Sequence, residues 1–452
     1  MVYSACSSEN AVCCRTEQTG FAAEDHSGGV YGILEKLIID GGTRLCGEVK
    51  LQGAKNSVLP ILAASILCDD ECYIDNCPRL SDCNVSMRII RHLGKSAYRD
   101  GGSVIIGNEE ITKNDIPEDM MREMRSSITF LGAIIAKMGE AKISLPGGCE
   151  LGPRPIDIHI SALRQMGVDI SENHGLIECK VRDKLRGAMI ALPYPSVGAT
   201  ENIILAAVLA KGTTIISNAA KEPEIVDLTI FLRSCGAKII GAGESTVIIC
   251  GVESLSGAYH KVIPDRIEAI SYMSAIAITG GTGEVIGVVP EHIMAVIPIF
   301  EESGCKLQST DSGLSITAPE RLGAVKYIRT MPYPAFPTDA QAIIMALMAQ
   351  SMGTSVFVET VFSGRYKHIA ELQRMGANIK AEDRVAVVSG IERLSGASVS
   401  ATDLRGGAAL VIAALGADGR SEISNIHYID RGYENIEGKL KKLGACITRV
   451  DS

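Results

Sequence analysis

Apolar and polar positions repeat along most of the chain at intervals of about 70 residues, and self-similarity at a fixed interval indicates a repeat architecture. Each repeat contains a stretch with the period of an amphipathic helix, such as residues 225–235, that ends just before a glycine. Glycine is the residue expected at a left-handed helix C-terminal cap. The predicted helix ends are Leu93-Gly94, Met166-Gly167, Cys235-Gly236, Ser303-Gly304, Met375-Gly376 and Leu443-Gly444.

Short strands recur at the same interval, each after a polar or glycine-containing turn. They are predicted at residues 72–74, 141–143, 214–216, 283–285, 355–357 and 421–423. A second strand follows the capping glycine, as at 237–240, and often a third, as at 246–250. The first strand of the ordered chain is expected at 37–39. The pattern therefore predicts six units of mixed α/β structure.

One such unit presents a helical face and a sheet face but cannot bury both, so several units have to share a core. A chain of 452 residues is too long for one ordinary core. We therefore expect an α/β protein with two domains of three units each. A cleft between two domains is a common place for a ligand.

Composition favours a cytoplasmic enzyme. The 53 acidic and 44 basic residues give a net charge of −9, which argues against nucleic acid and anionic membranes as main partners. The longest apolar runs, such as 203–210 and 408–415, are far shorter than the roughly 18 residues that span a bilayer. The 14 cysteines are too sparse for a disulfide scaffold, and residues 1–24 do not resemble a signal peptide. Residues 1–33 are predicted to be a poorly ordered extension.

The spacing of cysteines and glycines would reveal a metal site or a nucleotide-binding loop. Cys68, Cys72, Cys77 and Cys83 are followed by His92, but their spacing is irregular and contains no CxxC, so small core residues are a better interpretation than a zinc site. No GxGxxG follows a predicted strand, and no GxxxxGK[ST] occurs. The sequence therefore predicts neither a metal nor a dinucleotide cofactor.

The segment 145–159 is rich in glycine and proline and has to be a loop, and long ordered loops are often functional. In it Cys149 follows two glycines, and Arg154 and His159 come after it. A nearby cation would favour the thiolate form of Cys149. This is how a reactive cysteine would be presented, although a tight turn with an incidental small residue fits the same pattern.

Cationic side chains beside glycines or at predicted helix starts are candidate anion ligands. Lys55 precedes a helix-like stretch at 58–67, where an ammonium group would join free backbone donors, and Arg125 begins another helix. Arg365, Arg405 and Arg431 complete this set, because a guanidinium matches phosphate and carboxylate oxygens. Taken singly, Lys55 is more often a solvated surface lysine, and each of these arginines is more often part of a surface salt bridge. Asp339, which opens the predicted helix 340–349, fits a plain helix cap.

Taken together, these motifs resemble those of the UDP-N-acetylglucosamine 1-carboxyvinyltransferases, a family of enolpyruvyl transferases. The resemblance runs from about Leu37 to the C-terminus and excludes only the N-terminal extension. It rests on the segments 53–56, 146–149, 152–155, 196–200, 264–268, 337–339, 401–405 and 430–434.

The resemblance implies a two-domain inverse α/β barrel, the enolpyruvyl transferase fold, with three βαβαββ units in each domain. Carried onto this chain, residues 34–54 and 264–452 would form one discontinuous domain. Residues 55–263 would form the second domain, which carries the Cys149 loop. The chain would cross twice between them.

The resemblance also implies a reaction: the enolpyruvyl group of phosphoenolpyruvate is transferred to the 3′-hydroxyl of UDP-N-acetylglucosamine, and phosphate is released by addition and elimination. This is the first committed step of peptidoglycan precursor synthesis. By position, Cys149 matches the family's proton donor, which can also hold phosphoenolpyruvate covalently. Asp339 matches the candidate general base, and Lys55 and Arg405 complete the catalytic set.

Binding residues are carried over in the same way. Phosphoenolpyruvate would be bound by Lys55, Asn56, Arg154, Arg405 and Arg431. UDP-N-acetylglucosamine would be bound by Asn56, Arg125, Arg154, Pro155, Ile156, Asp157, Ile158, Tyr194, Pro195, Ser196, Val197, Asp339 and Val361. Some family members have a lysine where this chain has Tyr194. The implied partners are these two small molecules, with no cofactor, metal, nucleic acid, membrane or obligate protein partner.

Two alternatives stay open at this point. The sister enzyme that acts on shikimate 3-phosphate shares the fold and the type of reaction, but the Gly-Gly-Cys loop and the uridine segment favour the sugar nucleotide. A catalytically idle paralogue would serve as a binding or regulatory protein. Its expected signature is loss of the cysteine or of the anion-binding residues, all of which this chain retains.

Overall fold

A computed structural model describes residues 35–144 and 156–451 of the chain. In this part six four-stranded sheets form, and in each an outer strand runs parallel to its neighbour while the other pairs are antiparallel. All six strands predicted to recur every 70 or so residues are present as β3, β7, β11, β15, β19 and β23. The prediction of six α/β units is therefore confirmed, while the predicted extension at 1–33 lies outside the described residues.

Three sheets surround a first hydrophobic core, whose buried residues run from Val58 to Val262. They contain β14 (Tyr259–Lys261), β3 (Cys72–Asp75), β5 (Ser103–Ile106) and β4 (Ala97–Asp100); β6 (Asp115–Ile116), β7 (Glu140–Ser144), β9 (Leu176–Val181) and β8 (Val168–Asn173); and β10 (Met189–Ala191), β11 (Thr213–Ser217), β13 (Thr246–Cys250) and β12 (Lys238–Ile240).

The other three sheets surround a second core, whose buried residues run from Leu37 to Val49 or Leu51 and again from Ile267 to Ile447. They contain β22 (Ser398–Ser400), β23 (Arg420–Ser424), β1 (Glu35–Asp40) and β24 (Cys446–Asp451); β16 (Lys306–Ser309), β17 (Gly313–Thr317), β15 (Thr282–Ile286) and β2 (Cys46–Lys50); and β18 (Tyr327–Arg329), β19 (Thr354–Val358), β21 (Val385–Ser389) and β20 (Asn378–Glu382).

Helices fill both cores. The first contains α1 (Lys55–Ser65), α2 (Ser81–Leu93), α3 (Glu118–Glu123), the 3-10 turn η1 (Arg125–Thr129), α4 (Phe130–Met138), α5 (Asp157–Gln165), α6 (Val197–Ala207) and α7 (Pro223–Ser234). The second contains α8 (Arg266–Ile278), the 3-10 turn η2 (Pro290–Ile293), α9 (Ile297–Glu302), α10 (Thr338–Met348), α11 (Ile369–Arg374), α12 (Leu404–Gly416), α13 (His427–Asp430) and α14 (Ile436–Lys442).

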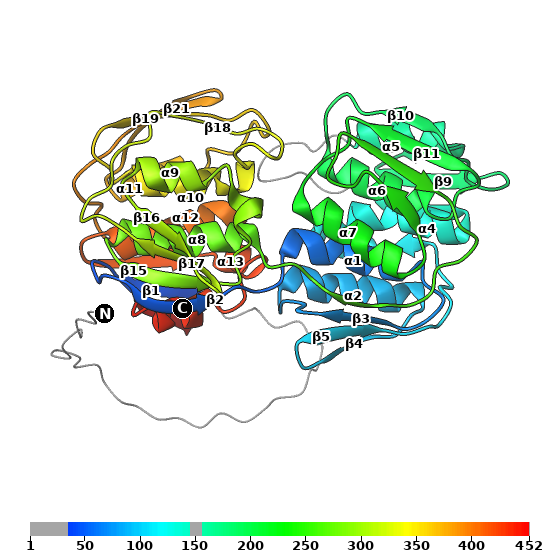
Figure 1. Ribbon diagram of the computed structural model, residues 1–452, viewed down its shortest axis with the longest axis horizontal. Coiled ribbons are helices and arrows are strands. Elements are labelled where there is room, and N and C mark those ends of the chain that lie inside the picture. Colours follow the sequence, from blue (N-terminus) through cyan, green and yellow to red (C-terminus); the bar gives the residue numbers. More distant parts are fainter. Residues whose placement is uncertain (1–34, 145–155, 452) are drawn as a thin grey trace. The chain divides into compact units, whose positions relative to one another are not determined.

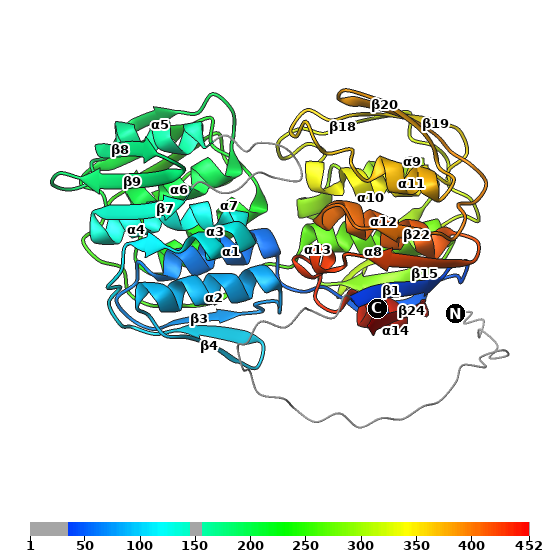
Figure 2. The ribbon, with the colours of Figure 1, turned by 180° about the vertical axis from the view of Figure 1, so that it is seen from behind.

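The helices α8, α10 and α12 pack on one another and are apolar on nearly all sides, which is the pattern of a helix enclosed by protein. Figures 1 and 2 show them inside their half of the chain, with sheets on the outside. In the first core α2 lies between α1 and the sheet of β3, β4 and β5 (Figure 1). The first residues of these buried helices carry most of the candidate site.

The six predicted glycine caps are confirmed in conformation. Gly94, Gly167, Gly236, Gly304, Gly376 and Gly444 all have φ between +91° and +121°, which L side chains rarely adopt. Three predicted helices begin a few residues too late. The helix predicted at 58–67 begins at Lys55, the one predicted at 225–235 begins at Pro223, and the one predicted at 340–349 begins at Thr338.

The sheets show how the two ends of the chain are used. β14 pairs with β3, which completes a sheet of the first core, and β1 and β2 pair with strands of the second core. The predicted domain boundaries fall between these groups of strands, and they stay a prediction. A search of the helices in the described residues found none long and apolar enough to cross a membrane.

Candidate active site

The first residue of α1 lies in a chain of three charged side chains. Lys55 Nζ is 2.7 Å from Asp82 Oδ2, and Arg431 binds the same carboxylate through Nε at 3.0 Å and Nη2 at 3.2 Å. Lys55 and Asp82 are both buried. Burial lowers the pKa of Lys55. The negative charge of Asp82 raises this pKa, while the positive charges of Arg431 and Arg405 lower it further. Asp82 thus holds Lys55 and Arg431, two residues predicted to bind phosphoenolpyruvate, side by side.

Asp339 is held by two arginines. Its Oδ1 accepts from Arg365 Nη2 at 2.8 Å, and its Oδ2 accepts from Arg405 Nη2 at 3.0 Å. Burial by itself would raise the pKa of Asp339, but Arg405 and Arg365 hold that pKa far below its usual range. The carboxylate keeps 27% of its side-chain surface exposed, so it stays accessible to a ligand.

The cap interpretation of Asp339 is wrong. The N-cap residue of α10 is Pro337, and no side chain caps that helix. Asp339 is the second helical residue, and its carboxylate binds guanidinium groups in place of backbone N–H groups.

Arg405 is positioned by the start of α12. The side chain of Asp403 caps this helix by accepting from the backbone N–H groups of Arg405 and Gly406 at 3.0 and 3.1 Å. Arg405 also lies 5.7 Å from the centre of the Tyr433 ring, and the Tyr433 hydroxyl bonds to Ser271 at 2.7 Å. The Nε of Arg405 is buried without a partner in the described part of the chain, so this guanidinium retains a donor for a ligand.

Consecutive residues of α1 connect the charged group around Asp82 with the charged group around Asp339. Lys55 contacts Asp82, while Asn56 donates from Nδ2 to Asp339 Oδ2 at 3.4 Å. The structure therefore brings together five predicted site residues, Lys55, Asn56, Asp339, Arg405 and Arg431. With Arg365 and Asp82 added, the group holds four cations and two carboxylates, which suits an anionic ligand.

The predicted nucleotide segments begin two neighbouring helices. Ile156, Asp157 and Ile158 lie at the start of α5, and Tyr194, Pro195, Ser196 and Val197 lead into α6, which packs against α5. Ser196 caps α6 by accepting from Ala199 N–H at 3.3 Å. Burial, followed by Glu222 and Glu359, raises the pKa of Tyr194, so its hydroxyl stays protonated at neutral pH.

Val361 lies beside the same glutamate. Its backbone N–H donates to Glu359 at 2.7 Å, and Glu359 also accepts from Thr338. Four further predicted site residues have no described side chain: Cys149, Arg154 and Pro155 lie outside the described residues, and the side chain of Arg125 is not described.

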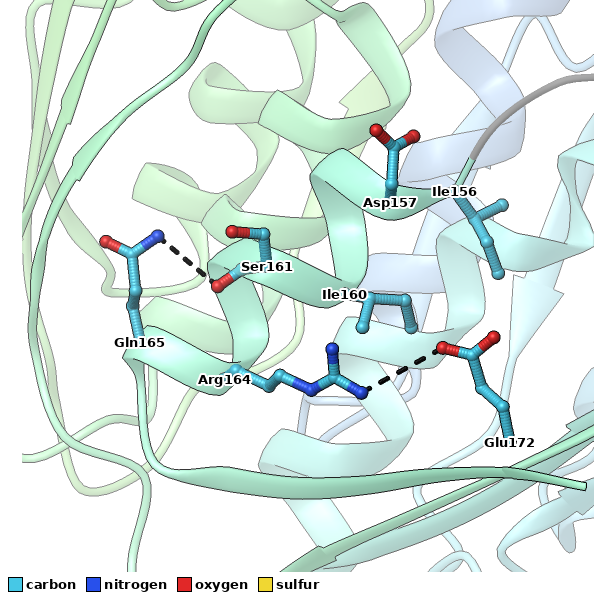
Figure 3. Close-up of a pocket in the computed structure, with 7 residues that line it drawn as sticks. All are labelled: Ile156, Asp157, Ile160, Ser161, Arg164, Gln165 and Glu172. Atoms are coloured by element: carbon cyan, nitrogen blue, oxygen red, sulfur yellow. Dashed lines mark hydrogen bonds and ion pairs between the residues drawn. The ribbon is translucent and has the colours of Figure 1, made fainter.

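A hollow of about 750 Å³ lies beside α5, and Figure 3 shows seven residues that line it. Ile156 and Asp157 line it, but its opposite side is formed by an ion pair, in which Arg164 lies 3.9 Å from Glu172. The charged residues described above do not line it. This hollow therefore adjoins the predicted nucleotide segment without containing the candidate catalytic carboxylate.

Three acidic residues near the site were not predicted. Glu201, Glu222 and Glu224 are buried, and Arg266 forms a bidentate pair with Glu224 at 2.9 and 3.3 Å. Burial, reinforced by Glu224 and Glu222, raises the pKa of Glu201 well above its usual value. Asp82 was missed as well. Nothing local marks these residues, because an acid near a helix start is usually a cap or a surface group.

The zinc interpretation of the cysteine group is not supported. Cys68 and Cys72 lie together with Cys235, whereas Cys77 lies with Cys83. Within the described ranges, no group of three or more His, Cys, Asp or Glu side chains is arranged for a metal ion.

Comparison with known proteins assigns the chain. Residues 39–440 match the family described as EPSP synthase (3-phosphoshikimate 1-carboxyvinyltransferase). UDP-N-acetylglucosamine 1-carboxyvinyltransferase 2 of Caldanaerobacter subterraneus is 48% identical over 92% of this chain and 99% of its own length. UDP-N-acetylglucosamine 1-carboxyvinyltransferase of Synechocystis is 45% identical over 91% of this chain and 95% of its own.

Solved structures agree on the fold. The enolpyruvyl transferase NikO from Streptomyces tendae is 25% identical, with a TM-score of 0.83 over 93% of this chain and all of that one. An EPSP synthase from Acinetobacter baumannii is 18% identical with a TM-score of 0.71 over 92% of this chain and all of that one, and this match concerns the fold alone. The chain belongs to the UDP-N-acetylglucosamine 1-carboxyvinyltransferase family, and it has the enolpyruvyl transferase fold.

Proposed function

We propose that this protein transfers the enolpyruvyl group of phosphoenolpyruvate to the 3′-hydroxyl of UDP-N-acetylglucosamine and releases phosphate, the first committed step of peptidoglycan precursor synthesis. One observation carries the proposal: Lys55 and Asn56, consecutive residues, connect a cationic pair to a carboxylate. Such a site can hold an anionic donor on one side and accept a proton from a sugar hydroxyl on the other.

Cations supply the binding of phosphoenolpyruvate and the departure of phosphate. Lys55 and Arg431 are held by one shared carboxylate, so their charges already converge before a ligand arrives. Arg405 adds a guanidinium whose Nε has no partner among residues 35–144 and 156–451. Such prearranged donors stabilise charge that develops on the phosphate as the C–O bond breaks. Arg154 is proposed to join them.

Asp339 is proposed as the base that takes the proton of the 3′-hydroxyl when its oxygen attacks C2 of phosphoenolpyruvate. Held by Arg365 and Arg405, it is a weak base in the free protein. An anionic substrate competes for these guanidinium groups and so raises the basicity of Asp339 when both substrates are present. Cys149 is proposed to donate a proton to C3 during the addition. When the C2–O bond to phosphate then breaks and phosphate leaves, C3 returns a proton to the Cys149 thiolate.

The sugar nucleotide is proposed to bind at the starts of α5 and α6, through Ile156, Asp157, Ile158 and the segment from Tyr194 to Val197. Arg125, Arg154 and Pro155 would complete this site, with Asn56, Asp339 and Val361 at the sugar. A protonated Tyr194 can donate one hydrogen bond but supplies no charge to the diphosphate. The proposed partners are the two substrates, and the proposed location is the cytoplasm, as expected from composition.

A phosphate-release assay tests the proposal. The purified protein is given phosphoenolpyruvate with either UDP-N-acetylglucosamine or shikimate 3-phosphate. We expect phosphate release with the sugar nucleotide only. Release with shikimate 3-phosphate would favour the sister enzyme, and no release with either acceptor would favour the idle paralogue.

A second experiment addresses Cys149. Fosfomycin, an epoxide that alkylates the loop cysteine of this family, is incubated with the protein in the presence or absence of UDP-N-acetylglucosamine, and the adduct is mapped by mass spectrometry. One adduct on Cys149 that forms faster with the sugar nucleotide is expected. Cys250→Ser removes an exposed thiol elsewhere and serves as the control. Labelling spread over several cysteines would contradict the proposed role of Cys149.

A further inference from the structure

A small cavity lies where the C-terminal ends of α8, α10 and α12 meet. Its volume is about 90 Å³. Ala277, Ile278 and Thr279 contribute the end of α8, Gln350 follows α10, and Gly416 ends α12. These are the ends opposite to those that carry Asp339 and Arg405, so the cavity is separate from the candidate active site.

Two donors beside the cavity have no partner in the described part of the chain: Gln350 Nε2 and Arg321 Nε. Gln350 is 7% exposed. Its Oε1 accepts from the backbone N–H of Leu394 at 3.2 Å, which fixes the orientation of the amide and leaves Nε2 as the unused end. Buried donors are nearly always satisfied, so a partner is expected here.

The missing partner has to be an acceptor, because both unused side-chain atoms are N–H donors. One carbonyl at the end of each helix accepts a backbone N–H: Ile276 from Gly281 at 3.0 Å, Ala349 from Ile391 at 2.9 Å and Leu415 from Gly42 at 2.9 Å. These bonds offset the negative ends of the three helix dipoles. Among the described residues, the two buried side-chain atoms left unsatisfied beside the cavity are both N–H donors.

Three arginines, Arg44, Arg321 and Arg393, and two glutamates, Glu320 and Glu392, line the cavity, so positive charge is in slight excess there and favours an anionic acceptor. Arg44 and Arg393 line the cavity but pair with Glu320 at 3.6 Å and with Asp418 at 2.9 Å. Arg321 donates from Nη2 to the Ser351 carbonyl at 3.4 Å, a neutral acceptor. A guanidinium prefers an oxyanion to water, and the Nε of Arg321 is free to contact one.

Gly416 keeps the site open. A Cβ on this residue would lie 2.2 Å from Gln350 Nε2 and 2.8 Å from a side-chain carbon of Ile278. Any side chain would therefore displace the amide donor. The volume admits a group larger than one water molecule, which needs about 10 to 15 Å³ of such space.

We propose that this cavity binds a small oxyanion of the size of phosphate or a short carboxylate, which accepts from Arg321 Nε and Gln350 Nε2 and links the ends of α8, α10 and α12. The proposal does not depend on the reaction proposed above. Separate titrations with inorganic phosphate and with acetate show whether the cavity prefers a tetrahedral oxyanion or a planar carboxylate.

Crystals soaked in selenate locate the site, because the anomalous signal of selenium identifies a tetrahedral oxyanion. We expect a peak within hydrogen-bond distance of Arg321 Nε and Gln350 Nε2. A water molecule alone in the cavity, or no density, would overturn the proposal.

Calorimetric titration with phosphate, and separately with acetate, tests binding in solution at constant ionic strength. The wild type is expected to show one binding event that Gln350→Glu abolishes, since that change replaces the donor with an acceptor of the same shape. Arg321→Met should weaken the same event at least about tenfold. Phosphate bound at the candidate active site would give a separate event, which both variants retain.

Arg186→Met is the matched control, because Arg186 is an exposed arginine in the other group of sheets. Its isotherm should equal that of the wild type. Circular dichroism checks that each variant is folded. If Gln350→Glu does not fold, the titration of Arg321→Met and the selenate soak test whether the cavity binds an oxyanion. Equal affinities in Arg321→Met, Arg186→Met and the wild type would contradict the proposal.

Discussion

Asp339 shows how one residue's neighbours set its chemistry. Two guanidinium groups hold it ionised and reduce its basicity, while Asn56 contacts the same oxygen that Arg405 binds. A carboxylate in this position gains strength as a base only when a ligand takes part of the charge of Arg405.

Asp339→Asn removes the proposed base while keeping its size. We expect kcat to fall by about 10² to 10⁴, the range for loss of a general base, while the KM of either substrate changes much less. Steady-state phosphate release measures both. The control is Asp40→Asn, which breaks an exposed pair with Arg420 outside the site and should keep full activity. An unchanged kcat in Asp339→Asn would exclude this residue as the base.

His159 makes stability depend on pH. It is buried, Asn202 donates to its Nδ1 at 2.8 Å, and burial lowers its pKa to about 4 from 6.5. Because the unfolded chain takes up this proton below pH 6.5 and the folded protein does so only near pH 4, stability is lost as pH falls between these values.

We expect the wild type to lose about 2 kcal/mol more than His159→Gln in the free energy of unfolding between pH 7 and pH 5. Urea unfolding of both proteins at the two pH values measures this difference. His427→Gln changes an exposed histidine and should behave like the wild type. The explanation fails if the unfolding free energies of the wild type and His159→Gln fall by the same amount between pH 7 and pH 5.

At the scale of elements, each buried helix of the second core carries a functional group at its N-terminal end. Asp265 caps α8 and also accepts from the backbone N–H of Lys55 at 3.1 Å, and Asp403 caps α12 just before Arg405. A cap fixes the first turn of a helix, so it also fixes the side chain that follows.

Asp403→Ala is therefore expected to act on both stability and catalysis. Loss of the cap should cost about 1 to 2 kcal/mol of unfolding free energy. It should also lower kcat/KM, because Arg405 loses its position. Asp403→Ser restores a capping oxygen and should recover most of both, as measured by urea unfolding and phosphate release. If the serine variant recovered stability alone, Asp403 would have a further role beyond capping.

The sequence predicts elements better than it predicts their partners. Glycines such as Gly236 mark helix ends because the left-handed conformation is a local requirement, and the repeat and the family were both recognised from such local motifs. Asp82 and Glu201 were missed because their burial depends on chain segments far away in sequence. Asp339 fitted a cap by local rules, and only the approach of Arg365 and Arg405 excludes that interpretation.

The whole molecule is organised by which strands complete which sheets. All strands around the first core lie between Cys72 and Lys261, with β14 as the last to join. The second core needs β1, which lies between β23 and β24, and β2, which pairs with β15. The first group is continuous in the chain and the second is not.

A fragment of residues 55–263 is therefore expected to fold alone, because it contains every strand of its three sheets. A fragment of residues 264–452 should remain unfolded, since it lacks the central β1 and the edge strand β2. Circular dichroism and cooperative urea unfolding of each fragment check this. Joining residues 34–54 to residue 452 by a short linker should restore the second fragment. A folded 264–452 fragment without that segment would contradict the predicted domain division.

The position of β1 also sets a waiting time during synthesis. β2 leaves the ribosome before β15, and at about 5 to 20 residues per second the interval is roughly 10 to 50 s. β1 waits longer, until β24 at the end of the chain has been made. Through this period β1 and β2 have unpaired edges while the first core folds. The nascent chain is thus most exposed to aggregation at its beginning, and a chaperone that binds there would protect it best.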